Sequence, residues 1–237
     1  MNEFWTEELE PGYYDLKFSK GLKSKRGVQS FWHLGTFKKM AEYLKPDMNH
    51  LDYACGPGTF IGMYTFGNSF GVDISENQIN YAKLNYGDKG KFDTLENFLN
   101  YKEKDSYDLI TIMGLIEFIS DEEILRLNEE LLKMVRKGGK LVYTTPNFRG
   151  LMFFLEIALN FFGKVNYSDE HVNKFSRKKL KNLFYDSTKS YKIKNFINVS
   201  LFFSIFSHSV ALKVENIVDK LFGSRFGSLM LIEINNV

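Results

Sequence analysis

Short apolar segments alternate with amphipathic segments through the middle of this 237-residue chain, and this alternation limits the fold more than any other feature. The predicted strands are HLDYA (50–54), SFGVDI (69–74), YDLITIM (107–113) and KLVYTTP (140–146), and the predicted helices between them are 75–86 and 120–139. Strands and helices that alternate at this spacing form parallel βαβ units. The pattern therefore predicts an α/β fold with a doubly wound sheet.

Both predicted helices begin at a recognisable cap. Ser75 is followed three residues later by Gln78, and Ser120 by Glu123, the spacing of a capping box. The pair Gly138–Gly139 predicts the end of the second helix. These signals fix where each helix should follow its strand.

The rhythm changes on either side of this region, while no repeat or low-complexity linker divides the chain. A helix is expected at 31–44, ended by Pro46. The stretches 191–201 and 228–235 are expected to form a terminal antiparallel pair of strands. We predict one domain, made of an N-terminal helical cap (1–48), a cofactor-binding core (49–147), a cap insert (148–190) and the terminal strand pair (191–237).

Composition excludes several classes of protein. A net charge of +2 argues against a protein built around nucleic-acid contacts, and the lysine-rich runs 20–26 and 177–181 are expected to be solvated faces. The single cysteine, Cys55, rules out an internal disulfide and a multi-cysteine zinc site, and no metal is expected. The N-terminus lacks the pattern of a signal peptide, so a cytoplasmic location is expected. The apolar run 151–162 is too short to span a bilayer; we expect a buried or pocket-capping helix, with contact to a membrane surface as the alternative.

The stretch LDYACGPG (51–58) marks the expected ligand site. In a doubly wound sheet, ligands bind beyond the carboxyl ends of the strands, and Gly56 and Gly58 let a ligand approach the backbone there. Asp73 ends the next strand, 21 residues (73 − 52) after Asp52, where it can accept hydrogen bonds from ribose hydroxyls. Asp52 places a negative charge beside the turn, which suits a cationic ligand and repels a pyrophosphate. The pattern favours a sulfonium nucleoside over a nicotinamide dinucleotide.

At this point the chain resembles the class I S-adenosylmethionine-dependent methyltransferases, in particular the subgroup that methylates small molecules, quinone precursors, sugars or surface glycans. The resemblance covers roughly residues 48–147 and rests on LDYACGPGTF, GVDIS, YDLITIMGLIEFI and LLKMVRKGGKLVYTTPN, which occur in the family's order. The stretch HVNKFSRKKLKNLF (171–184) also resembles a segment found after the fifth strand in that subgroup. The resemblance implies a Rossmann-like fold with a seven-stranded, mostly parallel sheet, a C-terminal antiparallel strand pair and a helical cap insert.

The resemblance also implies a role for each matching residue. The turn formed by Asp52, Ala54, Gly56 and Gly58 would hold the methionine part of S-adenosylmethionine, and Cys55 would lie inside the turn as a small buried side chain. Asp73 would bind the ribose hydroxyls and Ile74 would pack on the adenine. The candidates for the adenine edge are Leu95 and Glu96, and those for the methionine side are Met113, Gly114 and Leu115.

Two departures from the family bear on the chemistry. Ala54 stands where the family has its first glycine, a change that should leave the turn open. Glu117-Phe118 replaces the family's frequent Glu-His, so no acid–base role carries over to that position. A MGLI sequence replaces the motif typical of methyltransferases that act on bases or amides, which favours an oxygen acceptor on a small molecule, a glycan or a lipid-linked compound. His171 in the cap insert is the first candidate for a general base, and His33 is the second.

Two other classes of function stay open. The first is an NAD(P)-dependent oxidoreductase, which Asp52 and the irregular glycine spacing disfavour. The second is a non-catalytic S-adenosylmethionine-binding module, which damage to Asp52 or Asp73 would have indicated; both residues are intact.

Overall fold

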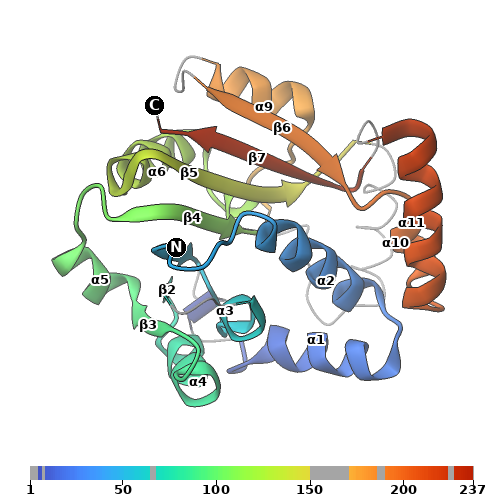
Figure 1. The fold of residues 1–237 in the computed structure, drawn as a ribbon, viewed down its shortest axis with the longest axis horizontal. Coiled ribbons are helices and arrows are strands. Elements are labelled where there is room, and N and C mark those ends of the chain that lie inside the picture. Colours follow the sequence, from blue (N-terminus) through green and yellow to red (C-terminus); the bar gives the residue numbers. More distant parts are fainter. Residues whose placement is uncertain are drawn as a thin grey trace.

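The computed structural model describes residues 5–6, 9–64, 68–149, 171–185, 190–223 and 227–236. Its centre is a seven-stranded sheet with the strand order β3-β2-β1-β4-β5-β7-β6 (Figure 1). The strands are β1 (His50–Tyr53), β2 (Ser69–Asp73), β3 (Lys91–Thr94), β4 (Tyr107–Met113), β5 (Val135–Pro146), β6 (Tyr191–Phe196) and β7 (Leu229–Asn235). The pairings from β3 to β5 are parallel, whereas β7 is antiparallel to both β5 and β6. The predicted doubly wound fold with a terminal antiparallel pair is confirmed.

Helices cover both faces of the sheet (Figure 1). The helices that the structure describes are α1 (Tyr13–Ser24), α2 (Val28–Ala41), α3 (Thr59–Tyr64), α4 (Glu76–Tyr86), α5 (Leu95–Tyr101), α6 (Asp121–Met134), α9 (Arg177–Phe184), α10 (Ser200–Phe203) and α11 (His208–Phe222), with a 3-10 turn η2 at Ile116–Phe118. One face packs Ile110, Ile112 and Tyr143 against α6 and α9. The other face packs Leu109 and Val142 against α1, α2 and α3. Because successive residues of a strand point to opposite faces, each strand contributes to both cores.

Several predicted boundaries were wrong. The helix expected at 120–139 ends at Met134, because Val135 begins β5 and pairs with Tyr107 of β4. The helix expected at 31–44 is α2, Val28–Ala41, and it ends well before Pro46. The strand expected at 191–201 stops at Phe196, and α10 and α11 follow before β7.

The two predicted helix caps differ in the structure. Ser120 and Glu123 form the full capping box. The Ser75 hydroxyl accepts a hydrogen bond from the Gln78 amide, but the Gln78 side chain does not return to the cap. That side chain binds the N-terminal segment instead, as described below. The apolar run 151–162 lies outside the described residues.

Candidate active site

The turn after β1 uses three residues with left-handed backbone. The φ angles of Ala54, Gly56 and Gly58 are 59°, 53° and 75°. A methyl group added at Gly58 would lie 2.7 Å from the Phe92 ring, so this glycine is required by packing. A methyl group added at Gly56 would have no atom of the described residues within 4 Å, apart from those of its chain neighbours. The surface over Gly56 is therefore an open cradle that the backbone lines directly.

Asp73 fastens this turn to the end of β2. Its Oδ2 accepts a hydrogen bond from the Gly56 amide at 2.8 Å, and its Oδ1 accepts one from the Ser75 amide at 2.9 Å. Burial raises the pKa of Asp73, and these amide hydrogen bonds partly counter that effect. The carboxylate sits where the sequence predicted it, at the carboxyl end of the second strand. A carboxylate has about four acceptor sites, so Asp73 has room for a further donor.

Asp52 lies at the end of a buried polar chain that crosses three strands. The Thr111 hydroxyl of β4 donates to Asp52 Oδ1 at 2.7 Å. His50 Nε2 lies 2.8 Å from the Thr111 hydroxyl, and His50 Nδ1 lies 3.0 Å from the Ser69 hydroxyl of β2. Asp52 Oδ2 has no hydrogen-bond partner among the described residues. An orphaned, fully buried carboxylate oxygen is a feature that a cationic ligand group would satisfy.

The protonation of this chain follows from its burial. Desolvation raises the pKa of Asp52 from 3.8 to about 7, with the Thr111 hydrogen bond opposing the rise and the charge of Asp73 adding to it. Desolvation lowers the pKa of His50 from 6.5 to about 3, so this imidazole is neutral. His50 and Thr111 were not predicted as site residues. The alternation of His50 and Thr111 with apolar residues indicates only which face of the sheet each side chain is on. The pairing of β1 with β4 is needed to show that the two side chains meet.

The remaining predicted cofactor residues lie at the ends of β2, β3 and β4. Ile74 follows Asp73 and is half-buried, and Met113 and Leu115 flank Gly114, which has a φ of 69°. The other two predicted residues open α5, where Leu95 is half-buried and Glu96 is exposed. Cys55 is buried against the β2 side of the turn, and burial raises the pKa of its thiol. The cofactor-binding role of these residues stays a prediction.

A second buried carboxylate lies just after β4. Glu117 of η2 accepts a hydrogen bond from the Thr145 hydroxyl of β5 at 3.1 Å, and a methyl group added at Gly114 would lie 3.6 Å from Glu117 Oε1. Burial raises the pKa of Glu117 from 4.5 to about 7. The Glu117 carbonyl also accepts the Asn173 amide at 2.9 Å, which draws the segment after residue 170 to the same strand ends.

An aromatic cluster forms beside this carboxylate. The His171 ring stacks on Phe118 with a centroid distance of 5.1 Å and meets the Phe148 ring edge-on at 5.0 Å. Trp5 meets the Phe118 ring edge-on with a centroid distance of 4.8 Å. We define these four residues as the aromatic cluster. It joins the N-terminal segment, the loop after β4 and the segments that follow β5, and it places His171 near the carboxyl ends of the strands. The catalytic role of His171 stays a prediction.

His33 has different surroundings. Its ring contacts include Tyr14, Phe18 and Phe37, which belong to α1 and α2. Burial lowers the pKa of His33 from 6.5 to about 4. Such an imidazole is neutral at pH 7 and is a weak base. Its catalytic role stays a prediction without a contact that supports it.

The N-terminal segment is held across the site by Gln78 of α4. Gln78 Oε1 accepts the Gly12 amide at 2.9 Å, and Gln78 Nε2 donates to the Glu10 carbonyl at 3.0 Å. Asp15 then accepts the hydroxyls of Tyr81 and Tyr86, both at 2.8 Å. The segment thus runs from α4, which follows β2, to Trp5 and Phe118 near the end of β4.

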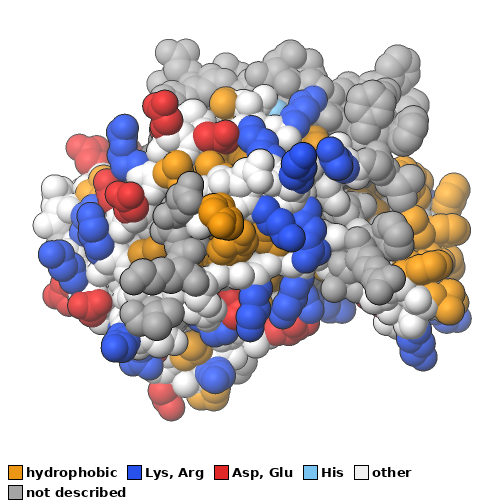
Figure 2. All heavy atoms as spheres, turned by 90° about the horizontal axis from the view of Figure 1, so that it is seen from above, with side chains coloured by type: hydrophobic (Ala, Val, Ile, Leu, Met, Phe, Trp, Pro, Cys, Tyr) orange, Lys and Arg blue, Asp and Glu red, His pale blue; other side chains and the backbone are white. Residues whose placement is uncertain are grey.

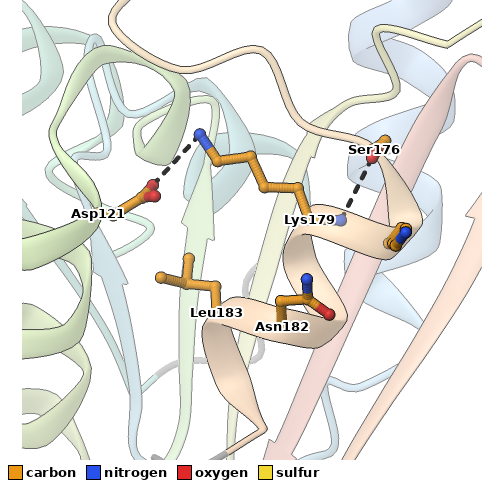
Figure 3. A pocket seen from close by; sticks show the side chains of 6 residues that line it. Asp121, Ser176, Lys179, Asn182 and Leu183 are labelled. Atoms are coloured by element: carbon orange, nitrogen blue, oxygen red, sulfur yellow. Dashed lines mark hydrogen bonds and ion pairs between the residues drawn. The ribbon is translucent and has the colours of Figure 1, made fainter.

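A hollow of about 500 Å³ opens at a different place, between α6 and α9 (Figure 3). Lys179 reaches across it to Asp121 at 3.5 Å, and the Ser176 hydroxyl caps the Lys179 amide (Figure 3). None of the described residues that line it belongs to the glycine turn or to the aromatic cluster. We therefore place the candidate active site at the glycine turn and not in this hollow. Within the described ranges, no helix has both the length and the apolar character that crossing a membrane requires.

The topology and the turn together define a class of protein. The strand order reverses between β1 and β4, and the glycine turn, Asp52 and Asp73 stand at that switch point, as in α/β proteins that bind a nucleoside. The chain belongs to the methyltransferase domain family, whose model matches residues 28–187, more than half of the sequence. No curated protein is similar enough to the sequence to count as a match.

Solved structures show the same fold at low sequence identity. A Thermotoga maritima S-adenosylmethionine-dependent methyltransferase, described as a possible histamine N-methyltransferase, is 17% identical with a TM-score of 0.62 over 89% of this chain and 91% of its own. A Streptomyces coelicolor A3(2) geranyl diphosphate C-methyltransferase, solved with S-adenosyl-L-homocysteine, is 15% identical with a TM-score of 0.57 over 85% and 78%. A Synechocystis PCC 6803 magnesium protoporphyrin IX methyltransferase with the same product is 15% identical with a TM-score of 0.53 over 88% and 87%. Family and fold both support S-adenosylmethionine as the cofactor.

Proposed function

We propose that the protein transfers a methyl group from S-adenosylmethionine to an oxygen of a small molecule, a sugar or glycan, or a lipid-linked compound. The observation that carries this proposal is the pairing of the open cradle over Gly56 with the orphaned oxygen of Asp52. The cradle accepts a ligand against the backbone, and the buried carboxylate favours a positive charge there. A pyrophosphate would meet that carboxylate with the wrong sign.

Different residues around the glycine turn would contact different parts of S-adenosylmethionine. Gly56 leaves room for the methionine part, and Asp52 offers Oδ2 to a cationic group. Asp73 keeps the turn in place through the Gly56 and Ser75 amides, and its free lone pairs are available to the ribose hydroxyls. When bound, S-adenosylmethionine supplies an electrophilic methyl group whose bond to sulfur breaks as the new bond to oxygen forms.

The aromatic cluster is the proposed acceptor side. Its rings are suited to exclude water and to hold an apolar or cyclic acceptor, which is the main contribution that a methyl transfer needs from the protein. The proposal assigns the proton of the acceptor hydroxyl to His171, which reaches the strand ends from the insert. Glu117 is buried beside Thr145 and Gly114 and would support the cationic imidazolium that results.

The donor is tested first, by thermal unfolding with S-adenosylhomocysteine and with NADH. We expect S-adenosylhomocysteine to raise the melting temperature and NADH to leave it unchanged. Stabilisation by NADH alone would show that the ligand is a dinucleotide, and the methyltransferase proposal would fail.

The acceptor side is tested with the full chain and a panel of hydroxylated small molecules, lipids and glycans, by transfer of a labelled methyl group. We expect His171→Ala to lower kcat at least about 100-fold and to leave S-adenosylhomocysteine binding unchanged, and His33→Ala to have little effect on kcat. Full activity of His171→Ala on a methylated acceptor would remove His171 from the chemistry.

A further inference from the structure

An exposed apolar stripe runs along α11. Val210, Ile217 and Leu221 are separated by seven and four residues, so they lie on one side of the helix. Ile217 is 57% exposed and Leu221 is 70% exposed. Phe206, in the turn before the helix, is 79% exposed and extends the stripe. The described structure shows only His208 and Ala211 of α11 as fully buried, so most of this helix faces outward.

These side chains form a coherent patch at the outer end of the molecule. Figure 2 shows hydrophobic side chains gathered at the edge of the protein where α11 lies, on the right in both Figures 1 and 2. Isolated apolar residues are normal on a protein surface, but a contiguous group of aromatic and branched side chains marks an interaction site. We define Phe206, Val210, Ile217 and Leu221 as the α11 stripe.

Basic residues border the α11 stripe. Lys213 and Lys220 lie seven residues apart on the same helix, next to the stripe, and both are exposed. The lysine-rich run 20–26 meets the start of the helix, because the Lys25 carbonyl accepts the His208 amide at 2.8 Å and the Gly27 amide donates to the Ser204 carbonyl at 2.7 Å. This run was expected to be only a solvated face, and the fold places it at the start of the helix that carries the stripe.

The acidic residues of α11 point elsewhere. Asp219 accepts a hydrogen bond from Asn198 Nδ2 at 2.9 Å, and burial raises the pKa of the Glu215 carboxyl to about 6. Asn198 belongs to the segment between β6 and α10, so these groups lie on the inner side of the helix. The outer side therefore combines apolar side chains with positive charge only.

We infer that the α11 stripe and its basic border dock on the surface of an anionic phospholipid bilayer. A helix with an exposed apolar stripe flanked by lysines lies in the plane of the interface, with its apolar side among the acyl chains and its lysines at the headgroups. A second copy of the chain fits less well, because a two-fold contact through the stripe would bring the lysines of both copies together. This inference does not depend on the proposed methyl transfer.

The position of the stripe also relates it to the candidate active site. Strands β5 and β6 are both antiparallel to β7, so they run in the same direction. Helices α10 and α11 therefore follow β6 on the side of the sheet where the parallel strands end, which is also the side of the glycine turn. Phe148 packs in the small core that includes Leu201 and Ala211, and it also meets His171. Docking on a bilayer would therefore bring the acceptor side close to the lipid surface.

The test is co-sedimentation of the full chain with vesicles of phosphatidylcholine alone and of an equal mixture of phosphatidylcholine and phosphatidylglycerol. We expect binding to the mixed vesicles that weakens as salt is added, and much weaker binding to phosphatidylcholine alone. The double variant Lys213→Gln/Lys220→Gln should bind the mixed vesicles about 25-fold more weakly, at about fivefold per lysine. Phe206→Ser should lower binding at least about tenfold.

Leu84→Ser is the matched control, because Leu84 is 86% exposed on α4, away from the stripe. It should bind vesicles like the unchanged protein. Equal binding by all the variants, or no binding to the mixed vesicles, would overturn the inference. Dimerisation in light scattering that Phe206→Ser abolishes would also overturn it, in favour of a second copy. A fall in melting temperature with Phe206→Ser and no vesicle binding would show that the stripe packs against another part of this chain.

Discussion

Because the surface over Gly56 is open, we expect Gly56→Ala to weaken ligand binding much more than it lowers the stability of the fold. Gly56→Ala adds a Cβ at a residue with a φ of 53° and no atom of the described residues within 4 Å, apart from those of its chain neighbours. Gly138→Ala is its matched control, because Gly138 has a φ of 79° and equally open surroundings. Gly138 lies near the amino end of β5, whereas the glycine turn lies at the carboxyl ends of the strands.

The expected change in stability is small and equal for the two variants. An alanine in left-handed backbone costs about 1–2 kcal/mol. The substitution also lowers the conformational entropy of the unfolded chain, which stabilises the folded protein by about 0.4–1 kcal/mol. The net loss in the free energy of unfolding is about 1 kcal/mol, or about 2–4 °C in melting temperature for a chain of this length.

The expected change in binding is large for Gly56→Ala alone. The new methyl group occupies the space that a ligand needs against the backbone, and overpacking of one methyl group costs about 1–3 kcal/mol, which weakens binding about 5- to 150-fold. Calorimetry with S-adenosylhomocysteine measures this loss directly. At a concentration 100 times its Kd the ligand adds about 2.7 kcal/mol to the stability, so the melting temperature of Gly138→Ala should still rise fully on addition of ligand.

One result would refute the reasoning. If Gly56→Ala and Gly138→Ala bind S-adenosylhomocysteine with the same affinity as the unchanged protein, the cradle is not the ligand site. A loss of binding in both variants would instead trace to a general loosening of the fold. Gly58→Ala does not serve as a probe, because its methyl group would strike Phe92 and the variant would test packing.

Three further predictions concern neighbouring residues. Ala54→Gly relieves a left-handed alanine and should raise the free energy of unfolding by about 0.5–1 kcal/mol without changing ligand affinity, measured by urea unfolding and calorimetry. Burial raises the pKa of Asp52 to about 7 in the folded protein, whereas the unfolded chain releases this proton near pH 4. Between these two values only the folded protein holds the proton. The free energy of unfolding should therefore fall as the pH rises from about 4 to about 7. Asp52→Asn should flatten that slope and exceed the unchanged protein in stability at pH 8 by on the order of 2 kcal/mol, and equal slopes would contradict the assigned shift. Gln78→Leu leaves the Gly12 amide without its partner. It should cost about 1–3 kcal/mol in the free energy of unfolding and expose residues 9–12 to limited proteolysis.

Local sequence signals were sufficient for four of the core strands and the glycine turn, whereas β3 (Lys91–Thr94) carried too weak a signal to be predicted. The four core strands follow from apolar segments bounded by turn residues, and Asp52 and Asp73 were placed because strand ends are easy to recognise. The end of α6 was missed because pairing decides it. Val135 could extend the helix by its neighbours alone, but its pairing with Tyr107 makes it the first residue of β5.

Contacts between distant residues account for the rest. His50 and Thr111 are 61 residues apart, and nothing local to either predicts that they share a hydrogen bond. Gln78 had the spacing of a cap residue, yet its side chain satisfies the backbone of residues 9–12. No acid–base role was carried over to Glu117 from the sequence, and its burial beside Thr145 and Gly114 became visible only in the fold.

The position of β7 in the sheet has a consequence for how the protein folds during its synthesis. Strand β7 lies between β5 and β6, although it follows both along the chain. As the polypeptide emerges from the ribosome, β5 and β6 are therefore complete while the edges that β7 will join still present unpaired amides and carbonyls. Such edges invite pairing with other chains. We expect the yield of folded protein to depend on how quickly this one strand is inserted, which makes Leu229–Asn235 the segment where substitutions would most affect aggregation during synthesis.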